Sequence, residues 1–183
     1  MAKRKSLIPT YSLLAVFLIT GGLFTGYAYW YEPKVEPATN SVAASIGSTG
    51  QRVFTKDDPW PLIYPNTKSM SIAEVRVRAS IAETWPERIR GLSNTPYLPM
   101  DVVKLFIFDS PGFHSIWMKD MNYPIDILWV DEGLSIIYIE EDVAPETYPS
   151  LFVPDSPAKY VIETASGFVA TNQIAVGDLV ILP

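Results

Sequence analysis

The sequence has no cysteine and only one histidine, and these two features exclude several kinds of catalytic and metal-binding site. Without cysteine the chain can form neither disulfides nor thiolate metal sites, and a cysteine nucleophile is excluded. One histidine, His114, provides no imidazole cluster for zinc and no evident base for a Ser-His-Asp triad. Phosphate-cradling glycine loops, dinucleotide-binding fingerprints and nucleophile elbows are also missing. The motifs therefore indicate no metal, no cofactor and no catalytic residue.

Basic residues are few. The chain has 14 Lys and Arg against 20 Asp and Glu, which gives a formal net charge of −6. Nucleic-acid binding depends on clustered Lys and Arg that neutralise phosphates, so no nucleic-acid partner is expected. Three of the basic residues, Lys3, Arg4 and Lys5, stand together at the N-terminus and have a different explanation.

A long uncharged segment follows these three residues. No charge occurs from Ser6 to Tyr31, and 26 helical residues span roughly 39 Å, more than a hydrocarbon core of about 30 Å. The preceding basic residues place the N-terminus in the cytoplasm by the positive-inside rule. Aromatic rings suited to the far interface end the segment, at Tyr27, Tyr29, Trp30 and Tyr31. We predict that residues 1–31 form a basic tip and one transmembrane helix, with the domain outside the cell membrane.

A cleaved signal peptide is the alternative for this segment. Gly26-Tyr27-Ala28 offers small residues to a signal peptidase, and cleavage near Ala28 would leave a secreted protein. The apolar stretch from Leu7 to Phe24 is longer than the usual core of about 7 to 15 residues in a signal peptide. This length favours the anchor over cleavage.

Residues 32–69 are expected to be a linker, and residues 70–183 a mainly β domain. Pro, Ser, Thr, Ala and Gly are frequent up to Ser69, and no period of 2 or 3.6 persists. Within the linker, Asp57 to Pro65 is too apolar for a spacer, so we expect it to pack onto the domain as a strap. The chain from Ser69 onward is nevertheless expected to fold alone.

Short strands dominate the expected domain. Val75 to Ile81 alternates apolar and polar residues, which predicts a half-buried strand. A capping box from Thr84 to Glu87 predicts a short helix with Trp85, Ile89 and Leu92 along one side. Further strands are predicted at 105–108, 113–118, 125–130, 134–139, 160–164 and 179–182, with turns at 109–112 and 131–133 and one helical turn within 167–173. The pattern indicates a sandwich or a partly closed barrel.

Five blocks of the sequence form one recognisable set, and they are Glu87-Arg88-Ile89-Arg90-Gly91-Leu92, Ile116-Trp117-Met118-Lys119-Asp120-Met121, Pro124-Ile125-Asp126-Ile127-Leu128, Glu163-Thr164-Ala165-Ser166-Gly167 and Gly177-Asp178. Together they resemble one known family, the bacterial and archaeal domain of unknown function 192, and they keep that family's order from about Val75 to Leu182. The resemblance implies a compact jelly-roll-like domain, commonly exported, with no agreed catalytic activity. Ser93, Val103-Lys104 and Met121 depart from the family's usual Met, Gly-Met and Thr, which puts in doubt any pocket property carried there.

Asp126 is the most informative candidate site residue. It is an acid inside an apolar strand, where a buried charge is costly unless it is paired. Lys119 is the nearest cation in sequence, and Arg90 after the helix cap is another. We expect Asp126 to pair with one of them as an ion pair that fixes strand register. A polar ligand contact beside Trp117 and an exposed aspartate on the wet face of the strand are the alternatives.

Glu163 repeats this pattern in a later strand. A small hydrolase using Asp126 and Glu163 as paired carboxylates is the alternative function, and it requires both groups to face one cleft. A purely structural envelope module is a third. The leading prediction is a membrane-tethered extracytoplasmic binding or interaction module for a small polar ligand or an envelope protein. Its predicted site is Arg90, Trp117, Lys119, Asp126 and Glu163.

Overall fold

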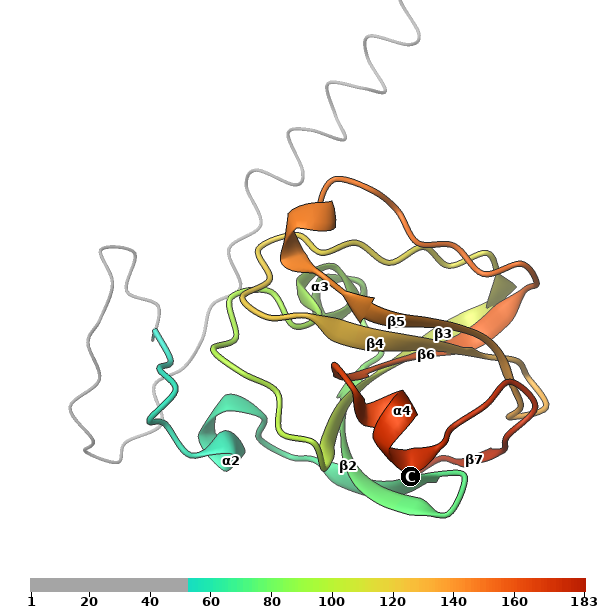
Figure 1. Ribbon diagram of the computed structural model, residues 1–183, viewed down its shortest axis with the longest axis horizontal. Helices are drawn as coiled ribbons and strands as arrows, with labels where there is room; N and C mark the ends of the chain where they lie inside the picture. The colour runs from blue at the N-terminus through green and yellow to red at the C-terminus, as the bar shows by residue number, and fades with distance from the viewer. Residues whose placement is uncertain (1–52) are drawn as a thin grey trace, which may run out of the picture. The chain divides into compact units, whose positions relative to one another are not determined.

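The computed structural model describes residues 53–183, and strands dominate this part of the chain (Figure 1). In chain order the elements are α2 (Trp60–Ile63), β1 (Lys68–Ile72), β2 (Val75–Ala82), α3 (Trp85–Arg90), β3 (Val102–Gly112), β4 (Ile125–Val130), β5 (Ile136–Val143), the 3-10 turn η1 (Pro145–Thr147), β6 (Ala158–Ala165), α4 (Phe168–Asn172) and β7 (Val180–Ile181). The predicted transmembrane segment lies outside the described residues. Among residues 53–183, no helix has the length and apolar character needed to cross a bilayer.

The strands form one mixed sheet that curls into a half-barrel. Their order is β5-β4-β6-β3-β2-β1-β7, with β2 and β3 parallel and the other neighbours antiparallel. The parallel pair needs a crossover connection, and α3 lies within it. A bridge between Ser135 and Leu179 links the start of β5 to β7, at the two ends of the strand order. The prediction of a mainly β domain with few short helices is confirmed, in the form of a single curled sheet.

Both faces of the sheet are buried, each under a different cover. In β4, Ile127 and Trp129 belong to one apolar cluster, whereas Leu128 and Val130 belong to the other. The cluster with Leu128 also contains Phe168 of α4, which lies on this side of the sheet in Figure 1. The cluster with Ile127 is covered by the strap and by loops. Because both faces are covered, all six residues of β4 are buried.

Three of the predicted strand boundaries are wrong. Residues 68–72 form β1, paired with β2, whereas the sequence analysis ends the linker at residue 69 and predicts no strand before Val75. Strand β3 continues through the predicted turn at 109–112, with a register shift between Ile107 and Gly112. Residues 113–118 make only an isolated bridge at Ile116. Between the register pairs of Ile107 and Gly112, β3 advances by five residues and β6 by two, so the predicted turn cluster interrupts the pairing register without ending the strand.

The strap packs on the domain as predicted. Ile63 and Tyr64 are buried in the core, and Trp60 is partly buried against the same cluster, whereas Leu62 is exposed. The guanidinium of Arg78 lies 5.7 Å from the centre of the Trp60 ring, at cation–π distance. Because two core side chains come from the strap, the autonomous folding unit is expected to begin before Ser69, near Val53.

Helix α3 has the predicted cap but a different burial. Thr84 and Glu87 form a reciprocal capping box, as the sequence indicates. Trp85 and Ile89, which the sequence placed with Leu92 along one side, are 60% and 44% exposed. Only Leu92, after the helix, is buried. Gly91 ends the helix at φ 48°, and a Cβ there would come 3.2 Å from Phe106, so glycine is required on both grounds.

Candidate functional site

The candidate site is a row of polar side chains across the middle of the sheet. Strand register places Ser80 of β2 beside Lys104 of β3, and Lys104 beside Glu163 of β6. The next partner in the row is Ile127 of β4, which belongs to the cluster under the strap and loops. Cross-strand partners point to the same face, so Lys104 and Glu163 both lie beneath this cover. They are 6% and 5% exposed.

Glu163 is a buried acid that lacks partners. Its Oε2 atom is buried and has no hydrogen-bond partner among residues 53–183, and no ion pair joins Glu163 to a described cation within 4.0 Å. Burial raises the pKa of Glu163 from 4.5 to about 8, and the charge of Lys104 lowers it by less. The group is therefore largely protonated at pH 7, and it can donate as well as accept a hydrogen bond.

Lys104 is the corresponding buried cation, and its hydrogen bonding within residues 53–183 is also incomplete. Its ammonium nitrogen has three donors but one hydrogen bond, to the Ser80 hydroxyl at 3.3 Å. Burial lowers the pKa of Lys104, and the nearby Glu163 raises it by a smaller amount. Desolvation thus outweighs mutual attraction for both groups, as it often does for buried opposite charges.

Phenol groups lie next to this row. The Tyr64 hydroxyl is 3.2 Å from the Tyr123 hydroxyl, and Thr95 contacts the Tyr123 hydroxyl in turn. Burial raises the pKa of Tyr64, and Glu163 contributes a smaller increase. Because the charge of Glu163 affects the pKa values of Tyr64 and Tyr123, these two hydroxyl groups lie within electrostatic range of the Glu163 carboxyl. Tyr64 reaches the site from the strap, which explains why the strap is structurally part of it.

Two charged residues of α3 mark the more exposed edge of the site. Arg90 and Glu87 both act electrostatically on Lys104, with opposite signs. Arg90 is exposed. Glu87 accepts bonds from the N–H groups of Glu83 and Thr84 at 3.1 and 2.9 Å, and these bonds lower its pKa. Of the predicted site residues, Glu163 lies in the row, and Arg90 acts electrostatically on its neighbour Lys104.

The predicted ion pair of Asp126 is wrong. Its carboxylate accepts bonds from the backbone N–H groups of Asp142 at 2.9 Å, Val169 at 3.0 Å and Gly167 at 3.3 Å. Neither Lys119 nor Arg90 forms an ion pair with it among the described residues. Backbone donors satisfy the buried charge, so no cation is needed.

The paired-carboxylate arrangement is also wrong. Asp126 is the register partner of Thr164, whereas Glu163 is the partner of Ile127. Successive residues of a strand point to opposite faces, so the two carboxyl groups lie on opposite sides of the sheet. They cannot flank one scissile bond, which removes the geometric basis for the hydrolase.

Trp117 and Lys119 lie in the loop between β3 and β4. Trp117 is 39% exposed and packs edge-on against Tyr148, with ring centres 6.4 Å apart. Lys119 is exposed, and its carbonyl accepts a bond from the Ser93 hydroxyl at 2.7 Å. Nothing in their contacts joins them to Glu163. Among residues 53–183, no group of three His, Asp or Glu side chains is arranged to hold a metal ion.

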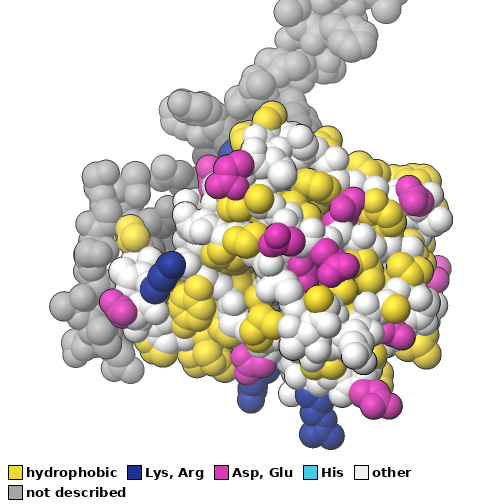
Figure 2. Space-filling view, viewed as in Figure 1, with side chains coloured by type: hydrophobic (Ala, Val, Ile, Leu, Met, Phe, Trp, Pro, Cys, Tyr) yellow, Lys and Arg dark blue, Asp and Glu magenta, His cyan; other side chains and the backbone are white. Residues whose placement is uncertain are grey.

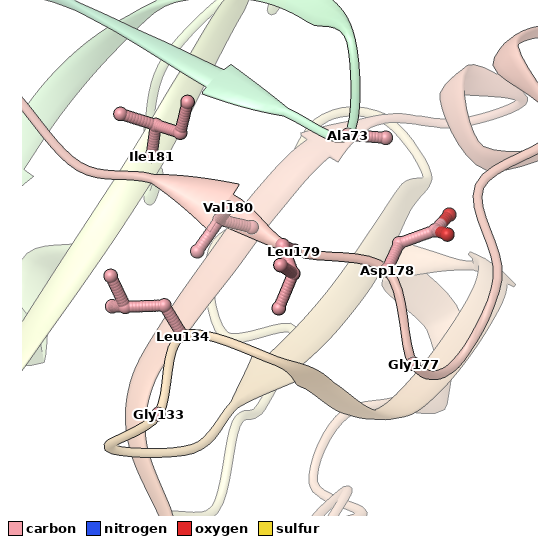
Figure 3. Close-up of a pocket in the computed structure, with 8 residues that line it drawn as sticks. All are labelled: Ala73, Gly133, Leu134, Gly177, Asp178, Leu179, Val180 and Ile181. Carbon is pink, nitrogen blue, oxygen red and sulfur yellow. The ribbon is translucent and has the colours of Figure 1, made fainter.

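A surface hollow lies elsewhere, beside β7 (Figure 3). It measures about 490 Å³ and is lined mainly by apolar groups, among them Leu134, Leu179 and Ile181. Its single charged side chain, Asp178, is turned away from these three in Figure 3 and accepts a bond from the N–H of Ala175 at 2.8 Å. None of the predicted site residues lines it.

Sequence reasoning missed Lys104, Tyr64 and Tyr123. A signal existed for Lys104, because a cation inside the apolar run from Val102 to Phe106 is as costly as the acid at Asp126. The phenols gave none, because their convergence depends on loops and a strap whose paths are not periodic.

Comparisons with known proteins agree with this fold. A model of the domain of unknown function 192 family, described as "Uncharacterized ACR", matches residues 67–182. A UPF0127 protein of Thermococcus sibiricus is 30% identical over 101 residues, which cover 55% of this chain and 63% of that protein. A second UPF0127 protein, from Thermococcus kodakarensis, is 26% identical over 103 residues, with 56% and 63% coverage. The chain thus spans less than two thirds of these relatives.

Two solved structures share the fold. A protein of unknown function from Novosphingobium aromaticivorans aligns with a TM-score of 0.60 and 19% identity, covering 82% of this chain and all of that one. A Sinorhizobium meliloti protein, described as a proposed transcription regulator, aligns with a TM-score of 0.57 and 23% identity, covering 61% and 88%. These likenesses concern the fold alone. The family match covers most of the half-barrel, and the chain therefore belongs to the domain of unknown function 192 family.

Proposed function

We propose that this protein is a membrane-tethered, extracytoplasmic binding module, and that it holds a small polar ligand at the Glu163–Lys104 row. One observation carries the proposal. Within the part of the chain that the structure describes, the Oε2 atom of Glu163 is buried without a hydrogen-bond partner, beside a buried lysine with a single side-chain bond. Native proteins rarely leave such groups unsatisfied, and function is one of the recognised reasons.

The chemistry of the row fits a ligand with polar groups at both ends. Protonated Glu163 can donate to a ligand oxygen, and Lys104 has free donors for a carboxylate or hydroxyl. Arg90, near Lys104 at the exposed edge, adds a second cation on the approach. Among residues 53–183, Glu163 is the one carboxyl group in the row of Ser80, Lys104 and Glu163, and the nearby Glu87 carboxylate already accepts bonds from backbone N–H groups, so the row lacks the paired carboxylates that a hydrolase of this kind requires.

Entry of a ligand requires the cover to move. Tyr64 belongs to the same apolar cluster as Ile127 of the row, its hydroxyl is linked through Tyr123 to Thr95, and it directly follows the four-residue helix α2 of the strap. A one-turn helix contributes little stability of its own, so its packing decides its position. Displacement of the strap would open the row from the side of α3.

The binding proposal predicts a ligand-dependent rise in melting temperature. We expect a member of a panel of free amino acids, hydroxy acids and short sugars to stabilise the wild-type chain by mass action. The same compound is expected to leave Glu163→Gln and Lys104→Met unshifted. The exposed Glu146→Gln is the matched control and should keep the wild-type response. An equal rise in all variants would place the ligand elsewhere.

The tether predicts an integral membrane protein. We expect the full-length chain to remain in the membrane fraction after carbonate washing, because the uncharged segment from Ser6 to Tyr31 is long enough to cross the bilayer. Extraction by carbonate, or a mature N-terminus at Tyr29, would show that the anchor is absent.

A further inference from the structure

Two loops joined by one isolated bridge, outside the main sheet, present apolar side chains to solvent. Ile116 and Phe152 exchange two backbone hydrogen bonds of 2.9 Å, which join the loop before β4 to the loop before β6. Ile116 is buried and Phe152 packs against the core. Their chain neighbours Trp117, Leu151 and Val153 are exposed instead.

Several apolar side chains on these two loops are exposed. Leu151, Val153 and Phe113 are 57%, 43% and 61% exposed. Trp117 packs against Tyr148, which is 45% exposed, so two aromatic rings support each other at the surface. We call Phe113, Trp117, Tyr148, Leu151 and Val153 the aromatic patch. Apolar side chains gathered in this way on two joined loops indicate a contact surface.

We propose that the aromatic patch docks on the surface of the bilayer that the protein's own N-terminal helix spans, an inference that rests on the proposed tether. Residues 32–52 separate the predicted helix from the described domain, and 21 residues reach at most roughly 70 to 75 Å when fully extended. The domain is therefore confined close to the bilayer, where a weak apolar contact becomes effectively intramolecular.

The composition of the patch suits a membrane interface. Tryptophan and tyrosine favour the headgroup level, where the ring is buried and its polar tip stays hydrated. Leucine, valine and phenylalanine supply the apolar area that drives insertion into the headgroup and acyl boundary. Trp117 and Tyr148 belong to the same aromatic patch as Leu151 and Val153. The patch therefore offers both the rings that favour the headgroup level and the apolar area that drives insertion.

The net negative charge of the domain disfavours two other partners for the aromatic patch, a second copy of the chain and a strongly anionic lipid surface. Residues 53–183 contain nine Lys and Arg against eighteen Asp and Glu, and acidic side chains outnumber basic ones on the face shown in Figure 2. Two copies of so acidic a domain repel each other, which disfavours self-association through the patch. Strongly anionic lipid is disfavoured for the same reason. The occupant is thus expected to be a bilayer rich in zwitterionic lipid.

Lipid quenching of tryptophan fluorescence tests the contact. The full-length chain is reconstituted into phosphatidylcholine vesicles, with or without brominated phosphatidylcholine, after flotation has shown that it is inserted. The wild-type emission minus that of Trp117→Phe isolates Trp117. We expect brominated lipid to remove most of this difference signal. The matching signal for Trp85→Phe, an exposed tryptophan outside the patch, should survive.

A second pair of variants distinguishes direct contact between the patch and lipid from a domain that is only held near the bilayer. Leu151→Asp, within the patch, is expected to protect Trp117 from brominated lipid, whereas Leu62→Asp, which is also exposed but lies on the strap, is not. An unquenched Trp117 signal in an inserted protein overturns the docking inference and leaves the tether intact. Cross-linking of patch to patch between two copies also overturns it. If the protein fails to insert into the vesicles, the proposed tether is overturned, and the docking inference that rests on it falls with it.

Discussion

Asp126→Ala is expected to destabilise the domain by about 3 kcal/mol or more, because three backbone donors lose their acceptor and each buried donor left unpaired costs about 1 to 3 kcal/mol. The donors belong to Asp142 on β5 and to Gly167 and Val169 at the start of α4. Asp126 is fully buried, so water cannot replace the carboxylate. Urea unfolding of the chain from Val53 onward measures the loss.

Two further variants provide reference values for the loss of stability expected in Asp126→Ala. Asp126→Asn keeps one carbonyl oxygen and turns an amide toward the remaining donors, so its loss should lie between wild type and alanine. Asp109→Ala removes an exposed acid of β3, and its effect should stay within about 0.5 kcal/mol. If Asp126→Ala costs no more than Asp109→Ala, the carboxylate does not brace α4 against β4.

The sequence predicted that Asp126 is buried and needs partners, but not which partners. Its apolar neighbours indicate burial, and that inference depends only on local pattern. Its donors are 16, 41 and 43 residues away, and any backbone N–H can serve as a donor. Backbone donors leave no trace in residue identity, whereas a cation would, so sequence reasoning chose Lys119 or Arg90.

The fold was predictable where alternation or capping is local. The strand at Val75, the helix at Thr84 and the hairpin from β4 to β5 all follow from such signals. β1 was missed because Lys68 to Ile72 is short and polar, and its pairing with β2 stabilises it. The opposite faces of Asp126 and Glu163 follow from register, which the turns and the partner strands decide together.

Glu163 is expected to make the stability of the domain fall as pH rises from about 4.5 to 8. In the unfolded chain this carboxyl ionises near its ordinary pKa of 4.5, whereas in the folded domain burial raises the pKa to about 8. Between these values the folded state binds more protons than the unfolded state. The stability present below pH 4.5 is therefore lost as pH rises toward 8, by up to about 1.4 kcal/mol per pH unit.

Other groups act outside this window or in the opposite direction. Glu87 has a lowered pKa, so its contribution is present above its ordinary value of 4.5 and is lost as pH falls below it. Lys104 also has a lowered pKa, and its contribution is lost as pH falls through its folded pKa, which opposes the slope of Glu163. Tyr64 and Tyr123, near the acid, have raised pKa values and titrate above the window.

Urea unfolding at pH 5, 6, 7 and 8 isolates the effect by comparison with Glu163→Gln, whose amide does not titrate. We expect the stability of the variant to change less with rising pH than that of the wild type, and the two curves to separate progressively up to pH 8. Lys104→Met removes the cation that lowers the pKa of Glu163, so the decline should extend to higher pH in that variant. The double variant, like Glu163→Gln, should lack the decline that the carboxyl causes. Parallel curves for wild type and Glu163→Gln would show that the carboxyl ionises normally in the folded domain, and the row would then lose the protonated acid on which the proposed ligand contact depends.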